Sequence, residues 1–72
     1  MRSVDGMIAE LWAAGWGVSR IECRSRTEPG NWRATAEKLL ASRNREFREA
    51  YGDTVQAAVR RLCRDCLGEG WE

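Results

Sequence analysis

The sequence contains no histidine, a single proline and a single lysine, and it has no long apolar run. Histidine is the commonest general base and metal ligand, so its absence removes the side chain on which many active sites depend. The sequence also lacks a glycine-rich phosphate-binding loop and the nucleophile elbow of hydrolases. We therefore expect no catalytic residues, no small-molecule substrate and a protein that is not an enzyme.

The lack of long apolar runs bears on location. A membrane-spanning helix needs about 20 apolar residues, and no segment approaches that length. The first residues, Met1 to Gly15, include Arg2, Asp5 and Glu10 and so lack the continuous apolar core of a signal peptide. We therefore expect a cytoplasmic protein, in the host cytoplasm if a phage encodes it, with no membrane partner.

The sequence also has no large excess of positive or negative charge. Twelve Lys and Arg residues against eleven Asp and Glu residues give a formal net charge of +1. Bulk electrostatic attraction to nucleic acid is therefore absent, and any such binding must come from a local patch. Every cation except Lys38 is arginine, which suits planar recognition of carboxylate, phosphate or guanine but is equally typical of a G+C-rich genome.

The three cysteines, Cys23, Cys63 and Cys66, should be reduced thiols or metal ligands in the cytoplasm. Cys63 and Cys66 are spaced so that two thiolates could hold one face of a tetrahedral zinc ion, with Cys23 as a third ligand. A fourth ligand is missing, and the same two cysteines fit the apolar face of a helix as small hydrophobic residues. We expect no cofactor.

Turn-forming residues separate apolar stretches with helical spacing, which predicts one all-α domain over residues 1–72. The expected architecture has four or five short helices. A helix-turn-helix-like part covers about 4–43, further helices cover about 45–67, and a tail covers 68–72. The one stretch in which a strand is the alternative is Gly17 to Cys23.

The first helix should start at a cap, Ser3 or Asp5, and end near Ala14, with Gly15 just beyond its C-terminus. A second helix over about Val18 to Ser25 and a third that starts at Asn31 should follow. The last helix should start after a cap at Asp53. The expected core consists of Ile8, Leu11, Trp12, Ile21, Leu39, Leu40, Phe47, Val55, Val59 and Leu62.

From Met7 to Tyr51 the order of these features resembles the helix-turn-helix of phage terminase small subunits and related phage regulators. The features are Leu11-Trp12-Ala13-Ala14-Gly15, Ile21, a turn, Thr35, Leu39-Leu40-Ala41, Glu46-Phe47 and Tyr51. In that family the third helix carries the side chains that read DNA. The resemblance therefore implies DNA contacts at the exposed positions Asn31, Arg33, Thr35 and Lys38.

A second resemblance lies at the C-terminal end. Cys63-Arg64-Asp65-Cys66-Leu67-Gly68-Glu69-Gly70 has the spacing C-x-x-C-x-G-x-G, which resembles half of the zinc site in DnaJ-type chaperones and in some phage late-gene antiterminators. This resemblance implies a role in transcription through a protein partner.

Two classes of function follow. The first is a small phage-type transcription regulator, antiterminator-like or inhibitory, that binds RNA polymerase or another transcription protein; another small protein-interaction inhibitor is a variant of it. The second is a sequence-specific helix-turn-helix protein that binds duplex DNA. Interleaved acidic residues also allow an ordinary solvated surface of ion pairs. The candidate contact residues are Trp16, Arg20, Arg24, Asn31, Arg33, Thr35, Lys38, Arg43 and Trp71.

Overall fold

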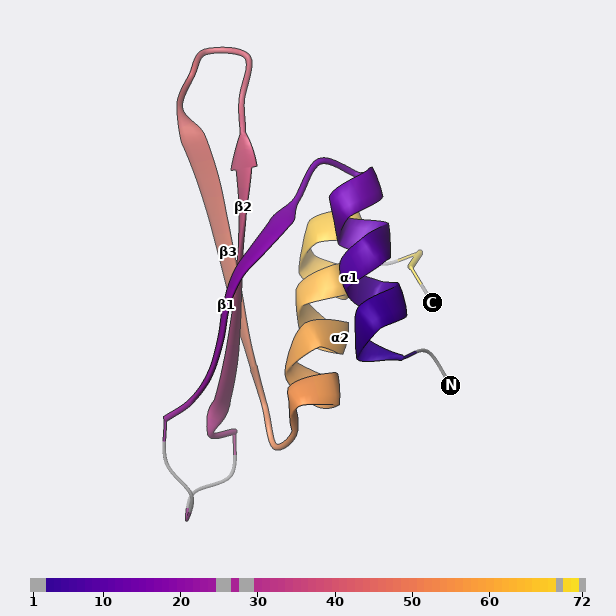
Figure 1. The fold of residues 1–72 in the computed structure, drawn as a ribbon, viewed down its shortest axis with the longest axis vertical. Helices are drawn as coiled ribbons and strands as arrows, with labels where there is room; N and C mark the ends of the chain where they lie inside the picture. Colours follow the sequence, from indigo (N-terminus) through magenta and orange to yellow (C-terminus); the bar gives the residue numbers. More distant parts are fainter. Residues whose placement is uncertain (1–2, 25–26, 28–29, 69, 72) are drawn as a thin grey trace.

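The computed structural model describes residues 3–24, 27, 30–68 and 70–71, apart from the side chain of Leu39. The elements in chain order are α1 (Val4–Ala13), β1 (Gly17–Cys23), β2 (Trp32–Leu39), β3 (Arg45–Gly52) and α2 (Val55–Leu67). The strands form one antiparallel sheet in the order β1-β2-β3. Both helices pack on the same face of this sheet (Figure 1). The expectation of an all-α domain is therefore wrong, because the chain is an α/β protein with two layers.

The two helices at the ends of the chain match the sequence prediction closely. The side chain of Ser3 caps α1 by accepting a hydrogen bond from the amide of Gly6 at 3.0 Å. Gly15 follows that helix at φ 93°, where a side chain would be strained. The cap of α2 is Thr54 rather than Asp53, and the Asp53 carboxylate instead accepts a hydrogen bond from the amide of Gly30.

The segments expected to form the second and third helices are β1 and β2, and the segment near Phe47 is β3. In β2 the alternation has period two, since Ala34 and Ala36 are fully buried while their neighbours point to the opposite face. Alanine, glutamate, lysine and leucine favour helices as isolated residues, which hides this alternation. Strand formation here depends on packing against other elements, which overrides such preferences. In β1 the strand alternative for Gly17–Cys23 is confirmed.

The core lies between the helices and the sheet. Its largest fully buried side chains are Met7, Leu11, Val59, Leu62 and Cys63. The sheet contributes small residues at these positions, namely Ala34, Ala36 and Ala50, together with the buried Gly52. Small residues allow α2 to lie close against β2 and β3.

Several of the expected core residues lie elsewhere. Leu11, Val59 and Leu62 are buried as expected, and Ile8, Ile21 and Val55 pack against the core while partly exposed. Trp12 and Phe47 are 74% and 58% exposed, so their assignment to the core is wrong. Leu40 lies in a turn and is only half-buried, and the Leu39 side chain is outside the described residues. Phe47 lies in a strand, where helical spacing does not apply, whereas Trp12 lies in α1 on a side of that helix that does not face the core.

The β2–β3 hairpin extends beyond the ends of both helices (Figure 1). We call residues 38–46 of this hairpin the arm. Its turn is closed by hydrogen bonds from the amide of Leu40 to the carbonyl of Asn44 (2.8 Å) and from the amide of Arg43 to the carbonyl of Leu40 (2.9 Å). Arg43 has φ 69°, a left-handed conformation normally taken by glycine or asparagine.

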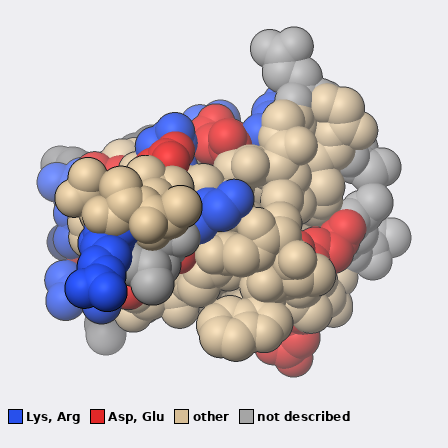
Figure 2. Space-filling view, turned by 90° about the horizontal axis from the view of Figure 1, so that it is seen from above, with Lys and Arg blue, Asp and Glu red and all other residues tan. Residues whose placement is uncertain are grey.

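Figure 2 looks down on this end of the molecule. Lys and Arg side chains gather on the half of the view that the sheet occupies, and the half over the helices is mostly uncharged. Within the described residues, neither helix has the length and apolar character that crossing a bilayer demands.

Candidate protein-docking surface

One face of the sheet carries no helix. Residues opposite one another in the antiparallel ladders project to the same side, so the register assigns each residue to a face. We call the face away from the helices the open face. Its residues are Arg20, Glu22, Arg33, Thr35, Glu37, Arg45, Phe47, Glu49 and Tyr51.

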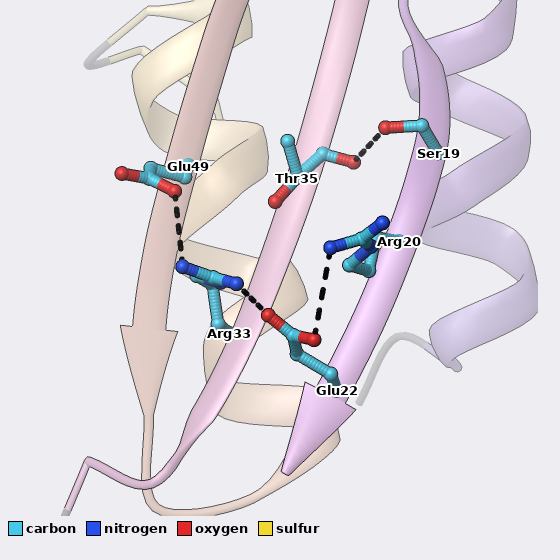
Figure 3. Close-up of polar contacts among 6 residues, drawn as sticks. All are labelled: Ser19, Arg20, Glu22, Arg33, Thr35 and Glu49. Carbon is cyan, nitrogen blue, oxygen red and sulfur yellow. Dashed lines mark hydrogen bonds and ion pairs between the residues drawn. The ribbon is translucent and has the colours of Figure 1, made fainter. Parts of the chain in front are cut away.

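Arg33 lies at the centre of an ion-pair network on the open face (Figure 3). Its guanidinium pairs with Glu22 on β1 and lies 3.9 Å from the carboxylate of Glu49 on β3. A second cation, Arg20, lies 3.9 Å from Glu22. The Arg33 side chain is only 28% exposed. Arg33 is therefore engaged by two carboxylates and is not the unpaired cation that base recognition in DNA requires.

Thr35 occupies the middle of the same face, next to Ser19. The Ser19 hydroxyl is 3.5 Å from the Thr35 carbonyl, which is a long hydrogen bond (Figure 3). Arg20, Arg33 and Thr35 are therefore neighbours across two strands. Arg33, Thr35 and Lys38 lie on β2, so the helix expected to start at Asn31 is wrong.

Trp16 lies on the other side of the sheet, within the core, and is only 5% exposed. The Lys38 ammonium and the Arg48 guanidinium each lie 5.7 Å from the centre of its indole ring. Such cation–π contacts stabilise the ring where it meets solvent. The indole of Trp16 is therefore buried and offers little exposed surface as a candidate contact.

The remaining candidate contacts are dispersed over the molecule. At the end of β1, the Arg24 guanidinium lies 5.5 Å from the centre of the Tyr51 ring, and Asn31 donates a hydrogen bond to the sulfur of Cys23. Arg43 is exposed at the tip of the arm. Trp71 packs against the core, and its indole N–H donates to the carboxylate of Glu10 at 3.4 Å.

Cys23 is not brought close to the other two cysteines, which are three residues apart on α2. Cys23, at the end of β1, pairs with Trp32, and Trp32 pairs with Gly52, so Cys23 lies at the level of the sheet where α2 begins. Cys63 follows the first residue of α2 by eight positions. Eight helical residues span about 12 Å, which separates Cys23 from the other two thiols. No group of three potential metal ligands occurs among the described residues.

The two thiols of α2 serve packing. Cys63 is fully buried, with its sulfur 3.7 Å from the carbonyl of Met7. Burial raises the pKa of the Cys66 thiol from 9.0 to about 11, with smaller increases from Asp65 and Cys63 and an opposing effect of Arg48. A thiol with this pKa is protonated at neutral pH, and metal ligation and nucleophilic attack both need the thiolate.

Two exposed aromatic residues were missed as candidate contacts. The ring of Trp12 lies at the β1 edge, with its Cζ3 atom 3.8 Å from the position a Cβ would take on Gly17. Gly17 and Phe47 are both paired with Glu37, on opposite sides of β2. Neighbouring strands are about 4.8 Å apart, so the backbones of Gly17 and Phe47 are about 10 Å apart. Trp12, beside β1, and Phe47, on β3, therefore lie at the same position along the strands, near the two opposite edges of the sheet.

The strand that carries Phe47 has no simple signal in the sequence. In Arg45–Tyr51, residues 45, 47, 49 and 51 lie on the open face, and 46, 48 and 50 point to the helix side. The charges occur on both faces, so this strand shows no simple alternation of polar and apolar residues. For this reason helical spacing placed Phe47 in the core, which is wrong.

Comparisons with protein-family models, with curated proteins and with solved structures returned no match for this chain.

Proposed function

We propose that the protein is a small regulator that acts in the cytoplasm by binding another protein, and that its partner belongs to the transcription machinery, such as RNA polymerase. The observation that supports protein binding is the pair Trp12 and Phe47, which are the exposed large hydrophobic residues of the described chain. Exposed tryptophan and phenylalanine are costly in water, and aromatic residues are enriched at the centres of protein interfaces.

The charge of the surface supports a protein partner as well. The formal net charge is +1, and the open face combines three arginines with three glutamates. Nucleic-acid affinity depends mainly on surplus cations that neutralise phosphates. A face on which acidic and basic residues balance suits a protein surface of mixed charge better than a polyanion.

The assignment of the partner to transcription rests on the sequence resemblance of the C-terminal motif to phage antiterminators. The residues of that motif have packing roles here, since Cys63 is buried and Cys66 is partly buried in α2. The protein-binding part and the transcription part of the proposal therefore have separate grounds and need separate tests.

The test uses purified RNA polymerase and the intact protein. We expect wild type to bind, and Trp12→Ser to weaken binding by about tenfold or more, because an interface aromatic hot spot contributes about 2 kcal/mol or more. Arg61→Ala is the control: Arg61 is exposed on α2, an element that carries neither aromatic residue, and the variant should leave binding unchanged.

Two results would contradict the proposal in different ways. Failure of wild type to bind the polymerase, with Trp12-dependent capture of an unrelated protein from the host, would remove the transcription assignment and keep the docking surface. Equal binding by wild type and by Trp12→Ser and Phe47→Ser variants would remove the docking surface itself.

A further inference from the structure

The outer strands of the sheet differ in how well their free edges are protected. The β1 edge is irregular, because its register shifts between Val18 and Arg20, and Trp12 lies against it at Gly17. The β3 edge has unbroken register with β2 over all its eight residues, and its sequence contains no proline. A long, regular free edge of this kind can pair with a further strand.

The backbone groups on the β3 edge can be identified. The amide of Leu40 donates to Asn44, so this pair is hydrogen-bonded across the hairpin, and hydrogen-bonded pairs then recur at every second residue. Consequently the N–H and C=O groups of Arg45, Phe47 and Glu49 point away from β2. The Arg48 guanidinium donates to the Phe47 carbonyl at 3.0 Å, which agrees with an outward direction for that carbonyl.

We propose that β3 pairs antiparallel with β3 of a second copy of this chain, about a two-fold axis at Phe47. In this register Arg45 is opposite the partner subunit's Glu49, and Glu46 is opposite the partner subunit's Arg48. Each pair occurs twice by symmetry, and each joins opposite charges. The signs along the strand, Arg45, Glu46, Arg48 and Glu49, are therefore complementary to themselves when the strand is reversed.

The charges also select this register over its neighbours. Backbone pairing between two equivalent edges requires the two-fold axis to pass through a residue pair, so the neighbouring registers are centred on residues 46 and 48. The first places Glu46 opposite its own copy, and the second does the same for Arg48. Centring on Arg45 or Glu49 again opposes like charges. Like charges directly opposite one another are destabilising in a sheet.

The arm fits the same arrangement. A two-fold axis perpendicular to the sheet keeps the open faces on one side, so the product is a six-stranded sheet with four helices on the other side. Antiparallel pairing about Phe47 brings Ser42, at the tip of the arm, opposite the partner subunit's Gly52, where α2 begins. The arm, which extends beyond its own helices (Figure 1), would then run beside the strand that the partner's helix covers.

This proposal does not depend on the identity of any other partner. Its test is the oligomeric state of the intact protein, measured by sedimentation over a range of concentrations. We expect a concentration-dependent dimer in wild type. Arg45→Glu and Glu49→Arg should each weaken the dimer by about tenfold or more, since each variant opposes like charges twice.

The double variant Arg45→Glu with Glu49→Arg is the decisive sample. It restores opposite charges between copies, so dimerisation should return to within a few-fold of wild type. Within one chain the same double variant opposes like charges at Arg45–Glu37 and at Arg33–Glu49, which pair in the native protein. If the single variants weakened the dimer only by destabilising each chain, the double variant would therefore dimerise still more weakly and would not recover.

A sample mixing labelled and unlabelled chains gives an independent readout. The non-hydrogen-bonded pair brings the α-protons of Glu46 and the partner subunit's Arg48 close together, so an interchain nuclear Overhauser effect should join them. The proposal is overturned by a wild type that stays monomeric at millimolar concentration. It is equally overturned by a dimer that Arg45→Glu does not weaken, or by a double variant that does not recover. Trp12→Ser separates the two proposals, because it should weaken partner binding and leave the dimer intact.

Discussion

Gly52 at the end of β3 lies directly against Ala58 in the first turn of α2. A Cβ on Gly52 would be 2.5 Å from the amide nitrogen of Ala58 and 2.8 Å from the carbonyl carbon of Ala57. Both contacts are with helix backbone, which cannot rotate away as a flexible side chain can. The absence of a side chain at residue 52 therefore determines how closely α2 approaches the sheet.

We expect Gly52→Ala to destabilise the protein by about 1–3 kcal/mol, the usual cost of overpacking a core. For a domain of this size, that cost lowers the melting temperature by several degrees per kcal/mol. Gly70→Ala is the control, since no atom lies within 4 Å of a Cβ at that position. Calorimetry should separate the two variants, and equal melting temperatures would show that the helix does not approach as closely as described.

Arg33→Ala should destabilise by about 1–2 kcal/mol, because it leaves the carboxylates of Glu22 and Glu49 without their central cation. The sequence pattern had predicted an exposed Arg33, whereas its side chain is only 28% exposed. Arg20→Ala, with its side chain 65% exposed, should change stability by less than about 0.5 kcal/mol. Urea unfolding measures both, and an Arg33→Ala variant as stable as Arg20→Ala would contradict the network.

Arg43→Gly should stabilise the protein by up to about 1 kcal/mol. A non-glycine residue at φ 69° is strained by its Cβ, and glycine removes this strain from the folded state. The free energy gained in this way exceeds the loss that comes from the greater flexibility of glycine in the unfolded chain. Ser42→Gly is the matched control one residue earlier, where φ is not positive, and it should be neutral or destabilising. If thermal unfolding shows that Ser42→Gly is more stable than Arg43→Gly, the turn has a different conformation in solution.

The Cys66 thiol predicts a specific pH dependence. Its pKa is raised to about 11 by burial, so the folded state favours the neutral thiol more than the unfolded state does. This contribution to stability is fully present below about pH 9 and is lost as pH rises towards about 11. Wild type should therefore lose stability over this range more steeply than Cys66→Ala does. Parallel pH profiles for the two proteins would show that the thiol is not buried.

Chemical labelling gives a second measure of the same property. Cys23 is exposed and should react with iodoacetamide at pH 8 well before Cys66, while Cys63 should stay unmodified until the protein unfolds. Mass spectrometry of peptides assigns the modified residue. Rapid labelling of Cys63 under native conditions would contradict its place in the core.

The ends of the chain were predictable because their signals are local. Ser3, Gly15 and the apolar spacing of the first fifteen residues define α1. The spacing of Val55, Val59 and Leu62 defines α2, although its cap is Thr54 and not the expected Asp53. Caps and helical spacing act within a few residues of one another, so they keep their meaning whatever the rest of the chain does.

The middle of the chain could not be assigned in this way. Ala34, Ala36, Glu37 and Lys38 form helices readily as isolated residues, and they form β2 only because β1 and β3 pair with it on both sides. The positions of the candidate site residues also depend on tertiary packing, so the sequence did not predict them correctly. Phe47 looks like a core residue in a helical reading, and its exposure is determined by which face of the sheet the two helices cover. Trp12 lies in α1, and its exposure is determined by which side of that helix faces the core.

The sequence by itself determined the terminal helices, the absence of histidine chemistry and the balance of charge, all of which depend on composition or on neighbours in the chain. Only the tertiary structure decided that the residues between the helices pair as strands. That pairing engages Arg33 between two carboxylates and leaves the β3 edge free. The physical reason is that strand hydrogen bonds join residues far apart in sequence, and their formation depends on the packing of the whole domain.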